Sequence, residues 1–176
     1  MSGPVPQKPE CDAEGCVGRL GMESFLEPQL ITHAVRVRVD RETGVCRVLE
    51  VAASHDCGVI LNPVGAEGQV EGGVVMGIGM ATLEGSIVGE DGRQRNPHLL
   101  DYKLQTAADA PPISIAFVDA PSPYGGPKGS KGTGEPPCVP TPGAIGNAIA
   151  QVTGARVHQL PMTPERVWAA AQGVDA

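Results

Sequence analysis

Hydrophobic and polar residues alternate most clearly at the start of the segment over residues 31–53. Along residues 35–40 valines alternate with charged residues, and this period of two is typical of a half-exposed β-strand. Residues 40–44 have the composition of a turn, and residues 45–53 form a second, more apolar run. The two runs predict a β-hairpin that begins at residue 31, and residues 113–118 predict a third strand.

Three segments begin with the start signal of a helix, an Asn or Thr directly before a proline. They run over residues 62–84, 141–154 and 163–173, with the Asn or Thr as the N-cap and the proline at the first helical position. The two shorter segments end in glycine, the residue that most readily adopts the left-handed conformation at a helix C-terminus. The pattern therefore predicts one long helix and two short ones.

The predicted long helix contains six glycines within residues 65–84. Each interior glycine costs about 1 kcal/mol of helix propensity relative to alanine, so about 6 kcal/mol must be offset by other interactions. We expect the glycines to allow close approach to another backbone or to a cofactor. Gln69 is a long amide in a helix otherwise rich in Gly, Val, Ile and Met, so it is either simply exposed or a donor aimed at a bound ligand.

The composition favours a loop-rich domain that needs a partner. The 176 residues include 24 glycines and 17 prolines, and 41% are hydrophobic but only 3% aromatic. A core without aromatic side chains buries less surface per residue, so we expect the domain to bury part of its surface against something larger. Residues 1–30 are rich in proline and glycine and predict a tail or linker, which leaves residues 31–173 as the folded domain.

Charge and cysteine usage argue against several classes of function. The net charge is −7 and no basic cluster is long enough for a nucleic acid, so we expect no nucleic-acid partner. No apolar run approaches the roughly eighteen residues of a membrane span and no signal peptide is evident, so we expect no membrane contact and a cytoplasmic location. Cys11 and Cys16 have the spacing that opens an iron–sulfur motif, but Arg19 stands at the third ligand position, so we interpret both as unpaired thiols.

The strongest candidate for chemistry is the loop over residues 125–137. Five glycines lie within its first ten residues, and two prolines directly follow Glu135. Because proline restricts the residue before it, we expect Glu135 to lie outside the helical region of backbone conformation, where it would be presented as a general base. The alternative is a solvent-facing carboxylate that Lys128 and Lys131 neutralise.

Other patterns are weaker signs of chemistry. Residues 77–82 lack the third glycine of a dinucleotide-binding fingerprint, and residues 125–132 lack the Gly-Lys-Ser/Thr order of a phosphate loop. His55 and Asp56 stand together without a second ligand pair at usable spacing. We therefore interpret His55 as a hydrogen-bonded histidine at a strand end and assign no metal ligand in the chain.

Several short motifs also occur together in a characteristic order: residues 39–44, 56–58, 62–63, 67–73, 77–79, 101–102 and Lys131-Gly132-Thr133-Gly134-Glu135-Pro136-Pro137. In combination they resemble the C-terminal molybdopterin-binding region of the xanthine dehydrogenase/aldehyde oxidase family of molybdenum hydroxylases, over about residues 33–171. The resemblance implies an α+β (α/β) fold with a small mixed sheet, a glycine-rich helix and C-terminal helices, like the second molybdopterin-binding domain of that family.

The resemblance also implies roles for particular residues. In that family a pterin cofactor holds molybdenum, and the enzyme uses water to hydroxylate a carbon of an aldehyde or an N-heterocycle. Glu135 matches the glutamate that acts as general base, and Gln69 matches a glutamine that contacts the cofactor. Gly132, Thr133 and Gly134 would supply backbone groups beside it.

The sequence departs from the family pattern in length. Family molybdenum subunits are several times longer, and their substrate-channel and first cofactor-binding segments have no counterpart here, so this chain would not hold the cofactor alone. The resemblance implies either a separate subunit, completed by a larger molybdenum-binding partner with FAD and iron–sulfur clusters on partner subunits, or the product of a truncated gene. The alternative is a non-catalytic scaffold or assembly domain. Cys138 stands where an aliphatic residue is expected.

Overall fold

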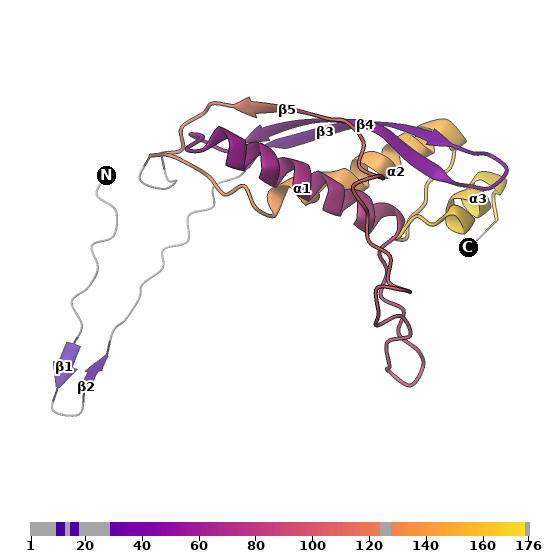
Figure 1. Ribbon diagram of the computed structural model, residues 1–176, viewed down its shortest axis with the longest axis horizontal. Coiled ribbons are helices and arrows are strands. Elements are labelled where there is room, and N and C mark those ends of the chain that lie inside the picture. Colours follow the sequence, from indigo (N-terminus) through magenta and orange to yellow (C-terminus); the bar gives the residue numbers. More distant parts are fainter. Residues whose placement is uncertain (1–9, 13–14, 18–28, 124–127, 175–176) are drawn as a thin grey trace.

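The computed structural model of the protein describes residues 10–12, 15–17, 29–123 and 128–174 (Figure 1). Most of the predicted tail over residues 1–30 lies outside these residues, as do the side chains of Cys11 and Cys16. β1 and β2 pair with each other in a separate antiparallel ladder. The elements in chain order are β1 (Glu10–Asp12), β2 (Gly15–Val17), β3 (Ile31–Val39), β4 (Cys46–Asp56), α1 (Pro63–Thr82), β5 (Ile113–Val118), the 3-10 turn η1 (Pro136–Cys138), α2 (Pro140–Thr153) and α3 (Pro164–Gln172).

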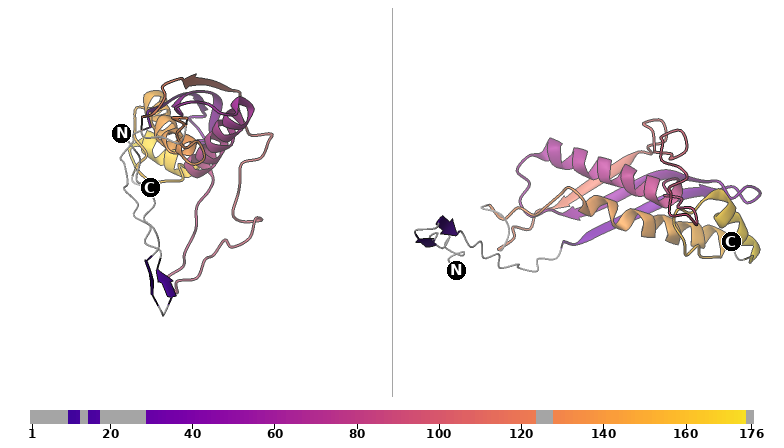
Figure 2. Two further views of the ribbon diagram at one scale, coloured as in Figure 1. Left: turned by 90° about the vertical axis from the view of Figure 1, so that its left-hand side faces the viewer. Right: turned by 90° about the horizontal axis from the view of Figure 1, so that it is seen from below.

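The main sheet has the strand order β3-β4-β5. β3 pairs antiparallel with β4, whereas β5 pairs parallel with β4, so the sheet is mixed as the sequence predicted. Parallel pairing requires a crossover connection, and α1 lies in the connection between β4 and β5. Figure 1 and Figure 2 show α1 and α2 together on one face of the sheet. The predicted α+β fold is confirmed.

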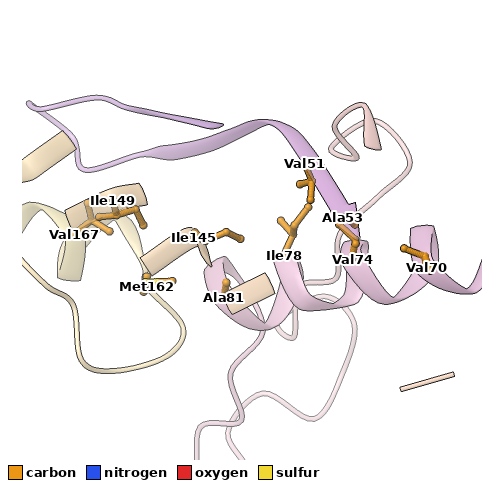
Figure 3. Close-up of a cluster of buried hydrophobic side chains, with 10 residues drawn as sticks. All are labelled: Val51, Ala53, Val70, Val74, Ile78, Ala81, Ile145, Ile149, Met162 and Val167. Atoms are coloured by element: carbon orange, nitrogen blue, oxygen red, sulfur yellow. The ribbon is translucent and has the colours of Figure 1, made fainter. Parts of the chain in front are cut away.

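The core lies between the sheet and the two helices that cover it. Along β3 exposure alternates from residue to residue, which confirms the predicted period of two. The buried cluster contains no aromatic side chain, as the composition led us to expect. Its ten members, shown in Figure 3, are Val51, Ala53, Val70, Val74, Ile78, Ala81, Ile145, Ile149, Met162 and Val167.

Capping signals correctly predicted two of the three helix starts. Asn62 caps α1, because its side chain accepts a hydrogen bond from the Gly65 N–H at 3.1 Å. Thr163 caps α3 in the same way by accepting from the Arg166 N–H at 3.5 Å. Both α2 and α3 end at glycines in the left-handed conformation, with φ of 79° and 71°. These local signals therefore fix the bounds of helices that carry part of the core.

The predicted start of the second helix at Thr141 is wrong. α2 begins at Pro140, and its N-cap residue Val139 makes no side-chain capping bond. Thr141 lies inside the first turn, where it is completely buried, and its hydroxyl donates to the Pro137 carbonyl at 3.3 Å. The Thr-Pro signal misleads here because a tertiary contact uses the hydroxyl that would otherwise cap the helix.

Two glycines of α1 bring the helix into direct contact with η1 and the start of α2. A Cβ atom at Gly73 would lie 2.6 Å from Cβ of Pro137, and one at Gly77 would lie 2.6 Å from Cβ of Thr141. No side chain fits at such distances, so glycine is required at both positions. The close approach to another backbone that the glycine-rich sequence predicted is therefore present.

The glycine contact predicts a position-dependent effect of alanine in α1. Gly77→Ala should destabilise the domain by about 2 kcal/mol or more, because the methyl group overpacks against Thr141. Gly72→Ala is the matched control: nothing lies within 4 Å of a Cβ at that position, so alanine should be neutral or stabilise the helix by up to about 1 kcal/mol. Urea unfolding of the two variants measures the difference, and equal stabilities would contradict the contact.

Candidate functional site

The glycine-rich loop is hydrogen-bonded to the chain that leaves β4. The Lys131 N–H donates to the Cys57 carbonyl at 2.8 Å, and the Val59 N–H donates to the Gly129 carbonyl at 3.1 Å. Gly58 lies between these partners with φ of 62°, and a Cβ atom there would lie 2.2 Å from the Gly129 carbonyl oxygen. Glycine is thus required for the loop to run this close to the end of the strand.

A nearly buried ion pair adds a second attachment of the same loop. The Lys131 Nζ lies 2.7 Å from Oδ2 of Asp56, and each side chain is only 11% exposed. The hydrogen bond from Lys131 holds the pKa of Asp56 below its usual value, and the Gly58 N–H contributes in the same direction. Lys131 therefore pairs with Asp56, which corrects the alternative in which it neutralises Glu135.

Gln69 lies on α1 beside the glycine-rich loop, with its side chain exposed. A Cβ atom at Gly134 would lie 3.8 Å from Oε1 of Gln69. Gln69 and Thr133 also line one surface hollow of about 270 Å³, together with Ser130 and Lys131 of the loop and residues at the start of α1. The structure thus brings together the glutamine and the backbone segment that the sequence analysis selected separately.

Glu135 lies at the start of η1 with its side chain exposed. Its φ of −85° and ψ of −32° are right-handed helical, so the prediction that Pro136 excludes this conformation is wrong. The Glu135 carbonyl accepts a hydrogen bond from the Cys138 N–H at 3.0 Å, and this turn hydrogen bond stabilises the conformation against the preference imposed by proline. With the described residues, the carboxylate makes no hydrogen bond or ion pair.

Gln29 belongs to the same region but was not predicted as a site residue. Its side-chain amide donates to the Gly132 carbonyl. It also lines a hollow of about 450 Å³ with Glu135 and Ile31. Gln29 lies in the segment expected to be a tail, and no motif or periodicity surrounds it. The sequence therefore contained no signal that would have selected it.

A histidine pair, of which His55 is buried and His33 partly buried, is connected to η1 through Thr141. The Nε2 atoms of His33 and His55 are 2.9 Å apart, and the His33 Nδ1 is 3.0 Å from the Thr141 Oγ1. Burial lowers the pKa of both rings, to about 4 for His33, where His55 adds to the effect. The interpretation of His55 as a hydrogen-bonded histidine is confirmed, but its partner was missed. His33 stands at an inward position of the alternating strand β3, which is the signal that would have identified it.

The site offers one exposed carboxylate, one exposed amide and a glycine-rich backbone. In the part of the chain that the structure describes, no three His, Cys, Asp or Glu side chains lie close enough together to hold a metal ion. Across the same residues, no helix is both long enough and apolar enough to cross a membrane.

The ion pair predicts a pH-dependent effect of removing its cation. Lys131→Met should lower the free energy of unfolding by about 3 kcal/mol at pH 7, because Asp56 is left as an unpaired, nearly buried charge. The pKa of Asp56 is depressed in the folded protein, so the pair stabilises above the usual aspartate pKa of about 4 and loses its effect as the pH falls below that value. The difference between native and variant proteins should therefore shrink in acid.

The control for this prediction is the exposed ion pair between Arg36 and Glu50. Their side chains are 62% and 54% exposed, so Arg36→Met should cost less than about 1 kcal/mol at pH 7. Denaturant unfolding of both variants at several pH values makes the comparison. Equal losses at neutral pH would contradict the anchoring role of Lys131.

Comparison with known proteins identifies the family. Residues 21–111 match the model of the molybdopterin cofactor-binding domain. The chain is 47% identical over 123 residues to the putative xanthine dehydrogenase molybdenum-binding subunit of Escherichia coli, covering 69% of this chain and 16% of that protein. It is 38% identical over 145 residues to the nicotine 6-hydroxylase large subunit of Paenarthrobacter nicotinovorans, covering 81% of this chain and 18% of that protein.

A solved structure agrees with the sequence matches. Quinoline 2-oxidoreductase from Pseudomonas putida 86 superposes with a TM-score of 0.75 at 34% identity, covering 81% of this chain and 18% of that chain. The chain thus spans only 16% to 18% of the length of these relatives. Together, the family model and the sequence identities show that the chain belongs to the molybdopterin cofactor-binding domain family, which occurs in molybdenum-binding subunits of xanthine dehydrogenases and aldehyde oxidoreductases.

Proposed function

We propose that this chain supplies one part of the active site of a molybdenum hydroxylase and that a larger molybdenum-binding chain supplies the rest. In this proposal the assembled enzyme uses water to hydroxylate a carbon of an aldehyde or an N-heterocycle, with Glu135 as general base. One observation carries the proposal: the exposed amide of Gln69 on α1 lies beside Gly134, and Glu135, whose carboxylate is exposed, directly follows Gly134 in the chain.

The residues around this segment fit a pterin cofactor. The side chains of Glu135 and Gln69 make no hydrogen bond or ion pair with the described residues, so both remain available to a ligand. Gly132 and Gly134 are exposed as well. A group that approaches Gly132 or Gly134 meets peptide backbone without a side chain, and beside Gly134 it meets an amide that can donate and accept hydrogen bonds.

Each of these residues has a defined task in the proposal. When bound, the molybdenum–pterin group would supply the redox chemistry of the hydroxylation. Glu135 would take the proton from the water-derived oxygen that attacks the substrate, a step that needs an ionised carboxylate within hydrogen-bond reach. The Gln69 amide would orient the cofactor, and the segment 132–134 would offer backbone N–H and carbonyl groups to it.

The outer face of α1 supports the need for a larger partner chain. Exposed apolar side chains can mark an interaction surface, and they lie on a side of α1 that the described residues leave uncovered, together with the exposed Glu67 and Glu71. We therefore infer that the larger chain covers this face beside the site, and that FAD and iron–sulfur clusters on further subunits take up the electrons. The exposed apolar residues of this face are Val64, Met76, Met80 and Leu83.

Replacing the proposed base should separate catalysis from assembly. In the complex with the larger chain, Glu135→Gln should lower kcat by at least about a hundredfold, because removal of a general base typically costs a factor of 10² or more. Molybdenum content should stay at the native level. Glu42→Gln, a change at an exposed carboxylate in the turn between β3 and β4, is the matched control and should leave kcat unchanged.

Two results would contradict the proposal. Native turnover of the Glu135→Gln complex would remove Glu135 from the mechanism. A native chain that never co-purifies with a molybdenum-containing partner when the two are co-expressed would favour a scaffold or assembly domain.

A second substitution tests the contact with the cofactor. Gln69→Leu replaces the amide with an apolar side chain of similar size. Cofactor occupancy of the complex at limiting molybdopterin should therefore fall about tenfold, as expected for the loss of one hydrogen bond worth about 1.4 kcal/mol. Gln151→Leu, at an exposed position of α2, is the control. Metal analysis of the purified complexes measures the effect, and equal molybdenum contents would argue against a role for Gln69.

A further inference from the structure

A continuous line of hydrogen bonds connects the sheet to η1. His55 on β4 and His33 on β3 meet through their Nε2 atoms at 2.9 Å, and the His33 Nδ1 lies 3.0 Å from the Thr141 Oγ1. The Thr141 hydroxyl donates in turn to the Pro137 carbonyl at 3.3 Å. His55 and Thr141 are 1% and 0% exposed, whereas His33 between them is partly exposed. The line ends two residues after Glu135.

The last acceptor of this line, the Pro137 carbonyl, determines which atom of each contact carries the proton. The Pro137 carbonyl only accepts, so the single hydroxyl proton of Thr141 points to it and the Thr141 oxygen accepts from the His33 Nδ1–H. A neutral His33 then has a bare Nε2, which accepts from the Nε2–H of His55. Every contact is satisfied when both imidazoles are neutral, and the tautomer of each ring follows from the hydrogen-bond pattern.

The protonation states agree with this assignment. Burial and, as the smaller cause, the neighbouring His55 together lower the pKa of His33 to about 4. Burial also lowers the pKa of His55. Both rings are therefore neutral near pH 7, and the line has one direction from β4 to η1.

η1 has few other polar contacts to hold it in place. Pro136 and Pro137 have no N–H group to donate. The backbone hydrogen bonds of the turn run from the Cys138 N–H to the Glu135 carbonyl at 3.0 Å and from the Val139 N–H to the Pro136 carbonyl at 3.3 Å, so both stay inside the turn. Among the described residues, the bond to the Pro137 carbonyl is thus the polar contact that leads from η1 to the sheet.

We propose that His33, His55 and Thr141 are positioning residues for Glu135. The inference rests on the proposed function, because it assigns to them the task of holding the turn from which the base projects. Packing against the glycines of α1 restrains η1 from one side. The hydrogen-bond line then fixes the position of η1 relative to the sheet. A displacement of about 1 Å at a reacting group can cost about a hundredfold in rate, so a small shift of η1 matters for catalysis.

Removal of one hydroxyl tests the proposal in the enzyme assembled with the larger chain. Thr141→Val keeps the volume of the side chain and breaks the line, so kcat should fall at least about tenfold while KM stays within about twofold and molybdenum content is unchanged. Thr141→Ser restores the hydroxyl and should restore most of kcat. Thr153→Val is the matched control, because its hydroxyl makes the same kind of bond to the Ile149 carbonyl, at 2.9 Å, near the other end of α2.

Amide hydrogen exchange provides a readout that does not depend on turnover. Peptides over residues 132–141 should exchange faster in Thr141→Val than in the native chain, and faster again than in Thr153→Val. His33→Phe breaks the same line with little change in ring size and should give the same acceleration. Because both changes act on one line, the double variant should exchange no faster than either single variant.

The two proposals can fail separately. Turnover of the Glu135→Gln enzyme overturns the proposed function, whereas exchange in Thr141→Val reports on the hydrogen-bond line whichever group is the base. Slower turnover together with faster exchange, reversed by Thr141→Ser, supports the positioning role. Native exchange rates in Thr141→Val, or faster exchange with native kcat, would overturn it.

Discussion

Close packing of α1 against η1 is the contact on which the rest of the site depends. At Gly73 and Gly77 a side chain would collide with Pro137 and Thr141, so only glycine lets the two backbones meet. Gln69 lies one helical turn before Gly73, and the proposed base directly precedes the turn that the glycines contact. One contact therefore sets the relative position of both proposed site residues, and the helix propensity given up by the glycines, about 1 kcal/mol each, is the cost of this arrangement.

The loop between these residues and the sheet is held at both ends. At one end, backbone hydrogen bonds and the Lys131–Asp56 pair attach the loop to the end of β4. At the other end, the hydrogen-bond line from His55 through His33 and Thr141 reaches η1. The segment between these attachments, residues 132–135, stays largely exposed. A loop that is rigid at its ends and open in its middle is the arrangement that a preorganised site requires.

Local sequence patterns correctly predicted the features that depend on neighbouring residues. The alternation in β3 follows from one buried face of a sheet, and the caps at Asn62 and Thr163 need partners only three residues away. The wrong cap assignment at Thr141 involves His33, a partner far along the chain. Thr141 has the signature of an N-cap, but His33 and the Pro137 carbonyl use its hydroxyl.

The proposed site shows the same division between local and distant interactions. The glycines of the predicted helix correctly indicated a close contact. No local sequence pattern distinguished the glycines that make this contact from those that remain exposed. Lys131 is close to Glu135 in the sequence, yet in the folded chain it pairs with Asp56. Asp56 lies at the end of a strand that no local sequence pattern connects to the loop. Glu135 was selected by its loop, whereas its helical backbone conformation depends on the turn that follows it.

The central claim is that this chain provides one side of a molybdopterin site whose other side belongs to a larger chain. A structure of the assembled complex with its cofactor tests this location of the cofactor most directly. We expect the pterin beside Gln69 and Gly134, the Glu135 carboxylate on the same side as the metal, and a segment of the larger chain over the outer face of α1. A cofactor enclosed by the larger chain alone, with Glu135 facing bulk solvent, would contradict it.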